Sequence, residues 1–339
     1  MYIRIKSYLR IQKIGKKLHF LLSPYKGIKI MHDDLLEQIL KKINSVGQKD
    51  SILQELESEL GLNKKITSLL INRMIDMHIL EYFNPNEDAG KFERYDRQLN
   101  FFDLTLQVKS REDLFLFQEK LSKSHVVILG VGGIGNYASI ALAGAGIGEL
   151  TLFDGDIIEY SNLNRQILFD EIDVGEVKID IAEKRLKKFN SNLKINKIQK
   201  HCSNESDLQK ELLNLGRIDF ILVSADKPRS MANWVDNFCS ENKVPFIPCG
   251  YFGNYGIVGP LISPETLTYA EKYPETLSIP KTNILDEIIY SPPSMACTNG
   301  IVSNIAVLEI IKYLTGFDKS ALLSKRLLLN FSEYNFNIE

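Results

Sequence analysis

The chain has 339 residues, of which 44% are hydrophobic and 25% charged, as in a globular protein large enough for two domains. Its formal net charge of -2 argues against a general nucleic-acid-binding protein, because such proteins carry a large basic excess. No segment approaches the ~18 consecutive apolar residues of a membrane span, and the four cysteines form no C-x-x-C pair. We therefore expect a cytoplasmic protein with reduced thiols that binds neither a membrane nor a nucleic acid.

Residues 1–83 predict a small domain of strands and three helices. The segments that indicate strands are 2–14, 18–22 and 79–83, and those with helical spacing of apolar residues are 33–43, 52–60 and 66–77. Gly61 follows the second helix, where a left-handed cap is favoured. This order of elements resembles a winged-helix unit. Its first 31 residues carry basic and no acidic side chains, which indicates either an anionic partner or a solvated face.

A linker and a larger α/β domain follow. Residues 84–92 are polar and contain Pro and Gly, as is typical of a linker. The remainder, 93–339, alternates between strands and helices from His125 onward. Strands are expected at 126–129, 149–153, 194–199 and 218–224, with helices from 134, at 177–190, 207–215 and 230–242. This alternation predicts a Rossmann-like parallel sheet covered on both faces, with ligands bound beyond the carboxyl ends of its strands.

A glycine-rich turn between the first strand and helix of this domain predicts a nucleotide site. The turn contains Gly130, Gly132, Gly133 and Gly135. Glycine lets the backbone approach phosphates closely, and the free N–H groups of the helix N-terminus attract anions. Asp154 ends the second strand, where an acidic side chain can hold ribose hydroxyls. The glycine pattern alone does not distinguish NAD from ATP.

Charged residues farther along the chain favour ATP over NAD as the bound nucleotide. Arg165 follows the second strand, Lys178 begins the next predicted helix, and Asp226 follows the strand at 218–224. Two cations and a carboxylate around a phosphate loop suit a triphosphate with Mg²⁺, whereas hydride transfer needs no such set. Taken singly, each of the three also suits a surface ion pair.

Six segments together resemble the ThiF/MoeB/ubiquitin-activating superfamily in order and spacing. They are Arg94-Tyr-Asp-Arg-Gln98, the strand and glycine loop at 127–135, and the segments 152–156, 162–166, 174–178 and 224–226. The resemblance covers about residues 93–315. It implies that ATP and a C-terminal carboxylate react to give an acyl adenylate and pyrophosphate.

The resemblance also implies roles for individual residues. Arg97, Arg165, Lys178 and Asp226 would be catalytic, with Asp226 holding Mg²⁺ and Arg97 reaching in from the partner subunit of a homodimer. The nucleotide would contact the four glycines and Asp154, together with Asp156, Asn162, Arg165, Gln166 and Lys178. Asp154 would bind the ribose, and Arg165 and Lys178 the phosphates.

Within the superfamily, the segments 224–228, 233–236 and 249–261 look most like the adenylyltransferase of microcin C biosynthesis. That enzyme modifies the C-terminus of a short ribosomal peptide and carries an N-terminal peptide-clamping winged-helix domain. A peptide substrate is therefore our first hypothesis. The alternatives are activation of a ubiquitin-like or sulfur-carrier protein ending in Gly-Gly, presentation of a leader peptide without catalysis, and DNA binding by residues 1–83.

The sequence departs from the superfamily pattern in its cysteines. The zinc-binding cysteine pairs of many members are absent, so we expect no structural zinc. Cys297 comes just before a predicted helix at 301–314, where it either packs that helix or acts as a nucleophile.

Overall fold

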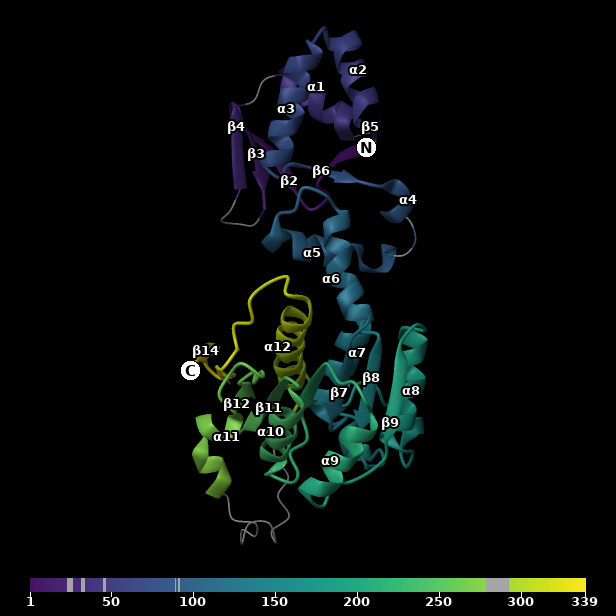
Figure 1. The fold of residues 1–339 in the computed structure, drawn as a ribbon, viewed down its shortest axis with the longest axis vertical. Coiled ribbons are helices and arrows are strands. Elements are labelled where there is room, and N and C mark those ends of the chain that lie inside the picture. The colour runs from purple at the N-terminus through teal and green to yellow at the C-terminus, as the bar shows by residue number, and fades with distance from the viewer. Residues whose placement is uncertain (23–26, 32–33, 45–46, 89, 91, 279–292) are drawn as a thin grey trace. The chain divides into compact units, whose positions relative to one another are not determined.

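The computed structural model of the chain contains two compact units, Met1–Glu119 and Lys120–Glu339 (Figure 1). It describes residues 1–339 except 23–26, 32–33, 45–46, 89, 91 and 279–292. The helix α5 (Asp96–Leu106), which the sequence pattern did not indicate, belongs to the first unit, and α6 (Glu112–Ser122) crosses the boundary. The short helix α4 (Pro85–Asp88) lies within the predicted linker. The functional domain limits 1–83, 84–92 and 93–339 stay a prediction.

Within the first unit, the described part of residues 1–83 combines two small sheets with three helices, as the sequence predicted for a winged-helix-like domain. Its strands are β1 (Tyr2–Ile5), β2 (Arg10–Ile14), β3 (Lys17–Leu21), β4 (Gly27–Met31), β5 (Gly47–Gln48) and β6 (Leu80–Phe83). Its sheets have the orders β5-β1-β6 and β2-β3-β4, with antiparallel pairing throughout. The helices α1 (Asp34–Asn44), α2 (Lys49–Leu60) and α3 (Lys64–Asp76) pack on a core that includes Ile3, Phe20 and Ile71.

The second unit is a Rossmann-like α/β domain, as predicted. Its strand order is β14-β13-β12-β11-β10-β7-β8-β9, and the five strands from β11 to β9 run parallel. The strands are β7 (His125–Leu129), β8 (Glu149–Phe153), β9 (Lys194–Ile198), β10 (Phe220–Val223), β11 (Phe246–Phe252), β12 (Tyr255–Val258), β13 (Leu327–Asn330) and β14 (Asn335–Ile338). The sequence pattern did not indicate the antiparallel extension β12–β14.

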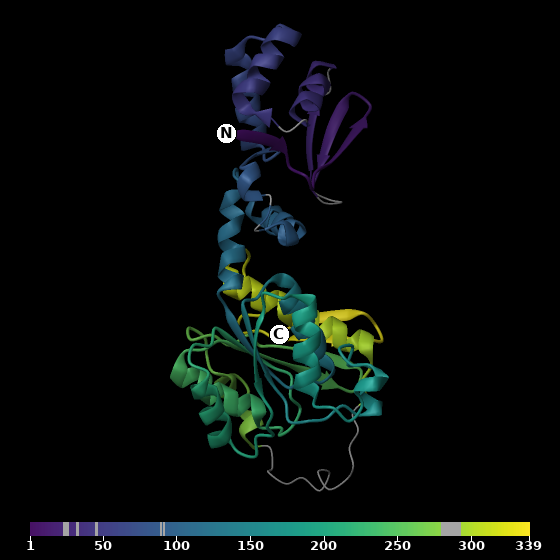
Figure 2. The same cartoon turned by 90° about the vertical axis from the view of Figure 1, so that its right-hand side faces the viewer.

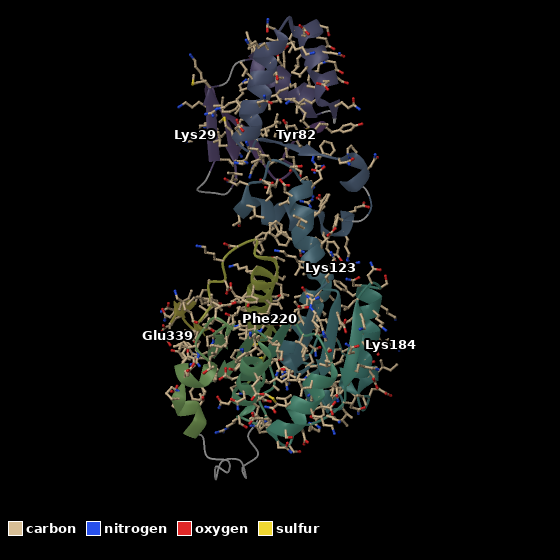
Figure 3. All side chains as sticks on the ribbon, in the orientation of Figure 1. Lys29, Tyr82, Lys123, Lys184, Phe220 and Glu339 are labelled. Carbon is tan, nitrogen blue, oxygen red and sulfur yellow. The ribbon has the colours of Figure 1, made fainter. Side chains whose placement is uncertain are left out.

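Helices cover both faces of this sheet (Figure 2). They are α7 (Gly133–Ala145), α8 (Lys178–Phe189), α9 (Glu205–Asn214), α10 (Met231–Asn242), α11 (Tyr269–Lys272) and α12 (Ala296–Thr315), and the same unit contains the 3-10 turns η2 (Tyr160–Asn162), η3 (Glu171–Asp173) and η4 (Pro274–Ser278). The 3-10 turn η1 (Glu93–Tyr95) precedes α5 in the first unit. Leu208, Leu212 and Phe238 from α9 and α10 pack on one face. On the other face α12 packs against α7, and Tyr313 of α12 meets the ring of Phe220 (labelled in Figure 3) edge to face.

The chain reverses its direction along the sheet at β7. From β7 it proceeds to β8 and β9 on one side and returns to β10 and β11 on the other. The connections leaving the carboxyl ends of β7 and β10 therefore diverge, and open α/β sheets bind their ligands in the crevice that this divergence creates. Within the described part of the chain, no helix has both the length and the apolar character of a membrane span.

Candidate active site

The glycine loop lies in the crevice between β7 and β10. Gly130 has φ +92°, and a Cβ at this position would lie 2.8 Å from the backbone nitrogen of Ala225, just beyond β10. A Cβ on Gly135 would lie 2.0 Å from the carbonyl oxygen of Gly130, so the first turn of α7 needs glycine to pack on the loop. A Cβ on Gly132 would meet nothing within 4 Å. The loop is therefore closely packed on two sides and open at Gly132.

Asp154, at the carboxyl end of β8, holds this loop. Its Oδ2 accepts a hydrogen bond from the N–H of Val131 at 2.6 Å, and its Oδ1 accepts one from the N–H of Asp156 at 2.9 Å. Burial raises the pKa of the Asp154 carboxyl, and the positive charge of Lys178 opposes that rise. Each carboxylate oxygen has a further lone pair, so these contacts are compatible with a bond to a ribose hydroxyl.

Lys178 reaches the same place from the first turn of α8, the helix marked by Lys184 in Figure 3. Its Nζ donates to Oδ2 of Asp156 at 2.7 Å, and the lysine side chain is only 6% exposed. The Asp156 side chain is about half exposed, at 52%. A buried ammonium whose carboxylate partner is accessible can exchange that partner for an entering phosphate.

The segment between β8 and α8 brings Asn162, Arg165 and Gln166 to the same end of the sheet. Asn162 is buried, and its Oδ1 caps η2 by accepting the N–H of Glu159 at 3.2 Å. Arg165 donates from Nη1 to the carbonyl of Ser161 at 2.8 Å. Gln166 is 2% exposed, and its Oε1 has no hydrogen-bond partner among the described residues. A buried acceptor without a hydrogen bond lowers the stability of the folded protein by about 1–3 kcal/mol. This oxygen is therefore suited to accept a hydrogen bond from a bound ligand.

Asp226 lies beyond β10, close in sequence to the residues that touch the glycine loop. Ser224, two residues earlier, donates from Oγ to the carbonyl of Gly130 at 2.7 Å. The Asp226 side chain is exposed and makes no hydrogen bond or ion pair with another described residue. A carboxylate placed in this way stabilises the fold little and is free to bind a ligand.

Three residues of the site escaped the sequence analysis. Tyr251, in β11, donates from its hydroxyl to Oδ1 of Asn299 at 2.5 Å, and Asn299 lies so close to α7 that a Cβ on Gly133 would meet it at 2.6 Å. Burial raises the pKa of Tyr251, and the charge of Arg165 lowers it. Asn136 donates to the carbonyl of Val131 at 2.7 Å and accepts from the N–H of Leu168 at 2.9 Å. Asn299 lies before the helix we expected at 301–314, so no local pattern marked it.

Arg97 lies in the first unit, on α5, with an exposed side chain. It makes no hydrogen bond or ion pair with another described residue. Its entry into the site of a partner subunit stays a prediction.

The donors present suit ATP and Mg²⁺. The first turn of α7 supplies N–H groups, Lys178 and Arg165 supply positive charge, and the exposed carboxylate of Asp226 is the ligand type that Mg²⁺ takes together with phosphate oxygens.

The cysteines give no sign of a metal site in the described residues, where no three His, Cys, Asp or Glu side chains are grouped to hold a metal ion. Burial raises the pKa of Cys202 to about 11 and that of Cys249 to about 12, so both are protonated thiols near neutral pH. Cys297 is exposed. The expectation that the protein lacks structural zinc rests on the sequence and stays a prediction.

Comparison with known proteins decides the family. The model of the ThiF family matches residues 95–339. The chain belongs to the ThiF family. This ThiF-family chain is 30% identical to the sulfur carrier protein ThiS adenylyltransferase of Escherichia coli over 231 residues, which cover 68% of this chain and 84% of the relative. It is 32% identical to the molybdopterin-synthase adenylyltransferase of Haemophilus influenzae over 200 residues, which cover 58% and 76%.

Solved structures extend the likeness to the first unit. Escherichia coli MccB with ATP matches with a TM-score of 0.77 and 27% identity over 100% of this chain and 96% of that one. The microcin C7 biosynthetic enzyme MccB in complex with N-formylated MccA matches with a TM-score of 0.78 and 25% identity. PaaA, at 24% identity and a TM-score of 0.79, shows the same fold. The protein is thus an ATP-dependent adenylyltransferase that activates a carboxylate.

Proposed function

We propose that this enzyme adenylates the C-terminal carboxylate of a short ribosomal peptide, as in microcin C-type peptide antibiotic biosynthesis. One observation carries the proposal. The ThiF family model begins at residue 95, whereas MccB matches all of this chain, including the winged-helix-like unit before that residue. Structures of MccB contain ATP in one case and N-formylated MccA in another.

The reaction follows from the groups at the carboxyl end of the sheet. A carboxylate oxygen of the peptide attacks the α-phosphorus of ATP, the bond between the α- and β-phosphates breaks, and pyrophosphate leaves. Lys178 and Arg165 neutralise charge that grows on the phosphate oxygens, and the N–H groups of α7 hold the phosphates. Mg²⁺, when bound, would be held by Asp226 and would neutralise the leaving pyrophosphate. Asp154 keeps the glycine loop in place and binds the ribose.

Peptide capture is assigned to the first unit. A groove of about 450 Å³ lies between the start of the chain and α1, with apolar lining from Ile5, Leu9, Ile11, Leu18 and Leu40. Lys13 and Lys41 lie at the same groove, and Glu37 pairs with both of them. An apolar groove bordered by charges is the kind of surface that binds an extended peptide by its side chains.

Assembly into a homodimer, with Arg97 entering the partner's site, is the second part of the proposal. Arg97, Phe101 and Leu104 are spaced by four and three residues, so they share one face of α5. Phe101 is 49% exposed and Leu104 is 37% exposed. Apolar side chains beside an exposed arginine are typical of subunit interfaces. In a dimer with two-fold symmetry this face would serve two sites.

The alternative, activation of a carrier protein ending in Gly-Gly, is favoured by the two curated relatives named above. Mass spectrometry of the products separates the two proposals. The enzyme is incubated with ATP and Mg²⁺, and either with synthetic peptides from the smallest open reading frames beside its gene or with a purified ThiS-like protein. The peptide proposal predicts an adenylate adduct on a peptide only. An adduct on the carrier protein alone would contradict it.

A further inference from the structure

Helix α5, which begins at Asp96 and carries Arg97, is held in the first unit by buried polar contacts. Lys6, in the turn after β1, donates from Nζ to Oδ2 of Asp103 at 2.6 Å and to the carbonyl of Val108 at 2.7 Å. The side chains of Lys6 and Asp103 are both 0% exposed. The carboxylate also accepts the N–H of Val108 at 2.9 Å and the hydroxyl of Tyr8 at 3.0 Å.

A second set of contacts holds the start of the helix. Arg111 is 1% exposed, donates from Nη1 to Asn100 at 2.8 Å, and pairs through Nη2 with Asp96. Its backbone N–H donates at 2.9 Å to the carbonyl of Tyr82, the residue labelled on β6 in Figure 3. Buried polar side chains thus fix α5 at Asp96, at Asn100 and at Asp103, two turns farther on.

Stability alone gives no reason for such an arrangement. Replacing a buried ion pair with apolar residues of similar volume is often neutral or stabilising, whereas a polar pair restricts the position of the elements that it joins. The fixed face of α5 adjoins the face that carries Arg97, because residues 96, 100 and 103 lie about a quarter turn from residue 97.

We propose that Lys6 and Asp103 are positioning residues for Arg97, so that the turn after β1 sets where the catalytic arginine is held. The inference rests on the proposed role of Arg97. The same turn lines the groove assigned to the peptide, through Ser7 and Leu9. A molecule seated in that groove therefore contacts the turn that holds α5.

The test is a double-mutant cycle measured by ATP–pyrophosphate exchange. Lys6→Met combined with Asp103→Asn removes both charges together, and so leaves no single buried charge unpaired. We expect turnover to fall by about tenfold or more with little change in the KM for ATP, since a misplacement of ~1 Å costs about 10²-fold. In an Arg97→Ala background the same pair of substitutions should cause no further loss. An equal loss in both backgrounds would overturn the proposal.

Two further variants distinguish the loss of Arg97 positioning from a general loss of stability. Tyr8→Phe removes one donor to Asp103 and keeps the ring, and it should lower turnover less but in the same Arg97-dependent way. The matched control is Arg4→Met with Glu81→Gln, an ion pair between β1 and β6 in which the Glu81 side chain is 2% exposed and the Arg4 side chain 20%. This control should reduce stability and leave turnover intact. Loss of turnover in the control equal to that in the Lys6/Asp103 variant would contradict the inference.

Hydrogen exchange separates this inference from the proposed function. In the Lys6/Asp103 variant, amides of residues 96–106 should exchange faster than in the wild type, while those of 34–44 keep their rates. Unchanged exchange at 96–106 would overturn the inference, whatever the substrate. Wild-type protein that adenylates no peptide would instead contradict the proposed function.

Discussion

Oδ2 of Asp154 lies 2.6 Å from the backbone nitrogen of Val131, so the end of β8 holds the glycine loop that follows β7. Asn136 holds the same loop from the other side, through the carbonyl of Val131 at 2.7 Å. Two side chains therefore hold the loop in one shape without a bound nucleotide. Preorganisation of this kind lowers the cost of ordering the loop when it binds a ligand.

Asp154→Asn should loosen this loop. The substituted amide can accept one of the two N–H bonds and presents a donor to the other, so one buried N–H loses its partner, at a cost of about 1–3 kcal/mol. We expect the free energy of unfolding to fall by that amount and the KM for ATP to rise. Asp180→Asn, which alters an exposed ion pair with Lys197, is the control and should change neither quantity appreciably. Equal behaviour of the two variants in urea titrations would contradict this account.

Gly133 and Asn299 should be energetically coupled. A Cβ on Gly133 would lie 2.6 Å from Oδ1 of Asn299, so Gly133→Ala should destabilise the protein by about 1–3 kcal/mol through overpacking. Adding Asn299→Ala should recover part of that loss, because it removes the atoms that clash. Gly132→Ala is the control: its Cβ has open space, so stability should hold while ATP affinity falls. If the losses of unfolding free energy caused by Gly133→Ala and Asn299→Ala simply add in the double variant, the clash with Asn299 does not cause the destabilisation of Gly133→Ala.

The groove of the first unit should govern the KM for the peptide. Ile11 lines the groove, whereas Ile14, on the same strand, lies on the opposite face of the sheet by alternation. Both side chains are partly exposed, at 38% and 54%, so Ile11→Glu and Ile14→Glu should leave the fold intact. We expect only Ile11→Glu to raise the KM for the peptide, with the KM for ATP unchanged. Point variants are preferable to removal of residues 1–83, which would take Lys6 away from Asp103. If Ile11→Glu and Ile14→Glu change the KM for the peptide equally, the peptide does not bind in this groove.

Mixed dimers test the role of Arg97. Arg97→Ala and Asp226→Ala should each be nearly inactive, although both side chains are exposed and neither substitution should destabilise the fold. If Arg97 acts in the partner's site, a heterodimer of the two variants has one intact site and one doubly damaged site. Co-expression with two different affinity tags should therefore restore a substantial fraction of wild-type exchange activity. Purified heterodimers as inactive as either parent would contradict action in trans.

The sequence predicted the parts of the structure that depend on local patterns. The glycine loop, the strands at β7 and β8, and the left-handed cap at Gly61 each follow from residues close together in the chain. Gly61 has φ +63°, and its N–H donates to the carbonyl of Leu56, as expected of such a cap.

What the sequence did not predict depends on partners that are distant in the chain. Helix α5 was missed because its buried face includes Asn100 and Asp103, which break the apolar pattern of an amphipathic helix. Asp103 is satisfied by Lys6, 97 residues away, and no local signal reports such a contact. The pairing of Tyr251 with Asn299 spans 48 residues and was missed for the same reason.

ATP–pyrophosphate exchange with one peptide in two forms tests the central claim most directly. A peptide that receives the adenylate is prepared with a free C-terminal carboxylate and as the C-terminal amide, and label from pyrophosphate is followed into ATP. The amide lacks the anionic oxygen that attacks the α-phosphorus, so we predict Mg²⁺-dependent exchange with the carboxylate and none with the amide. Exchange at equal rates with both forms of the peptide would contradict the account. Exchange with a Gly-Gly carrier protein but with neither form of the peptide would also contradict it.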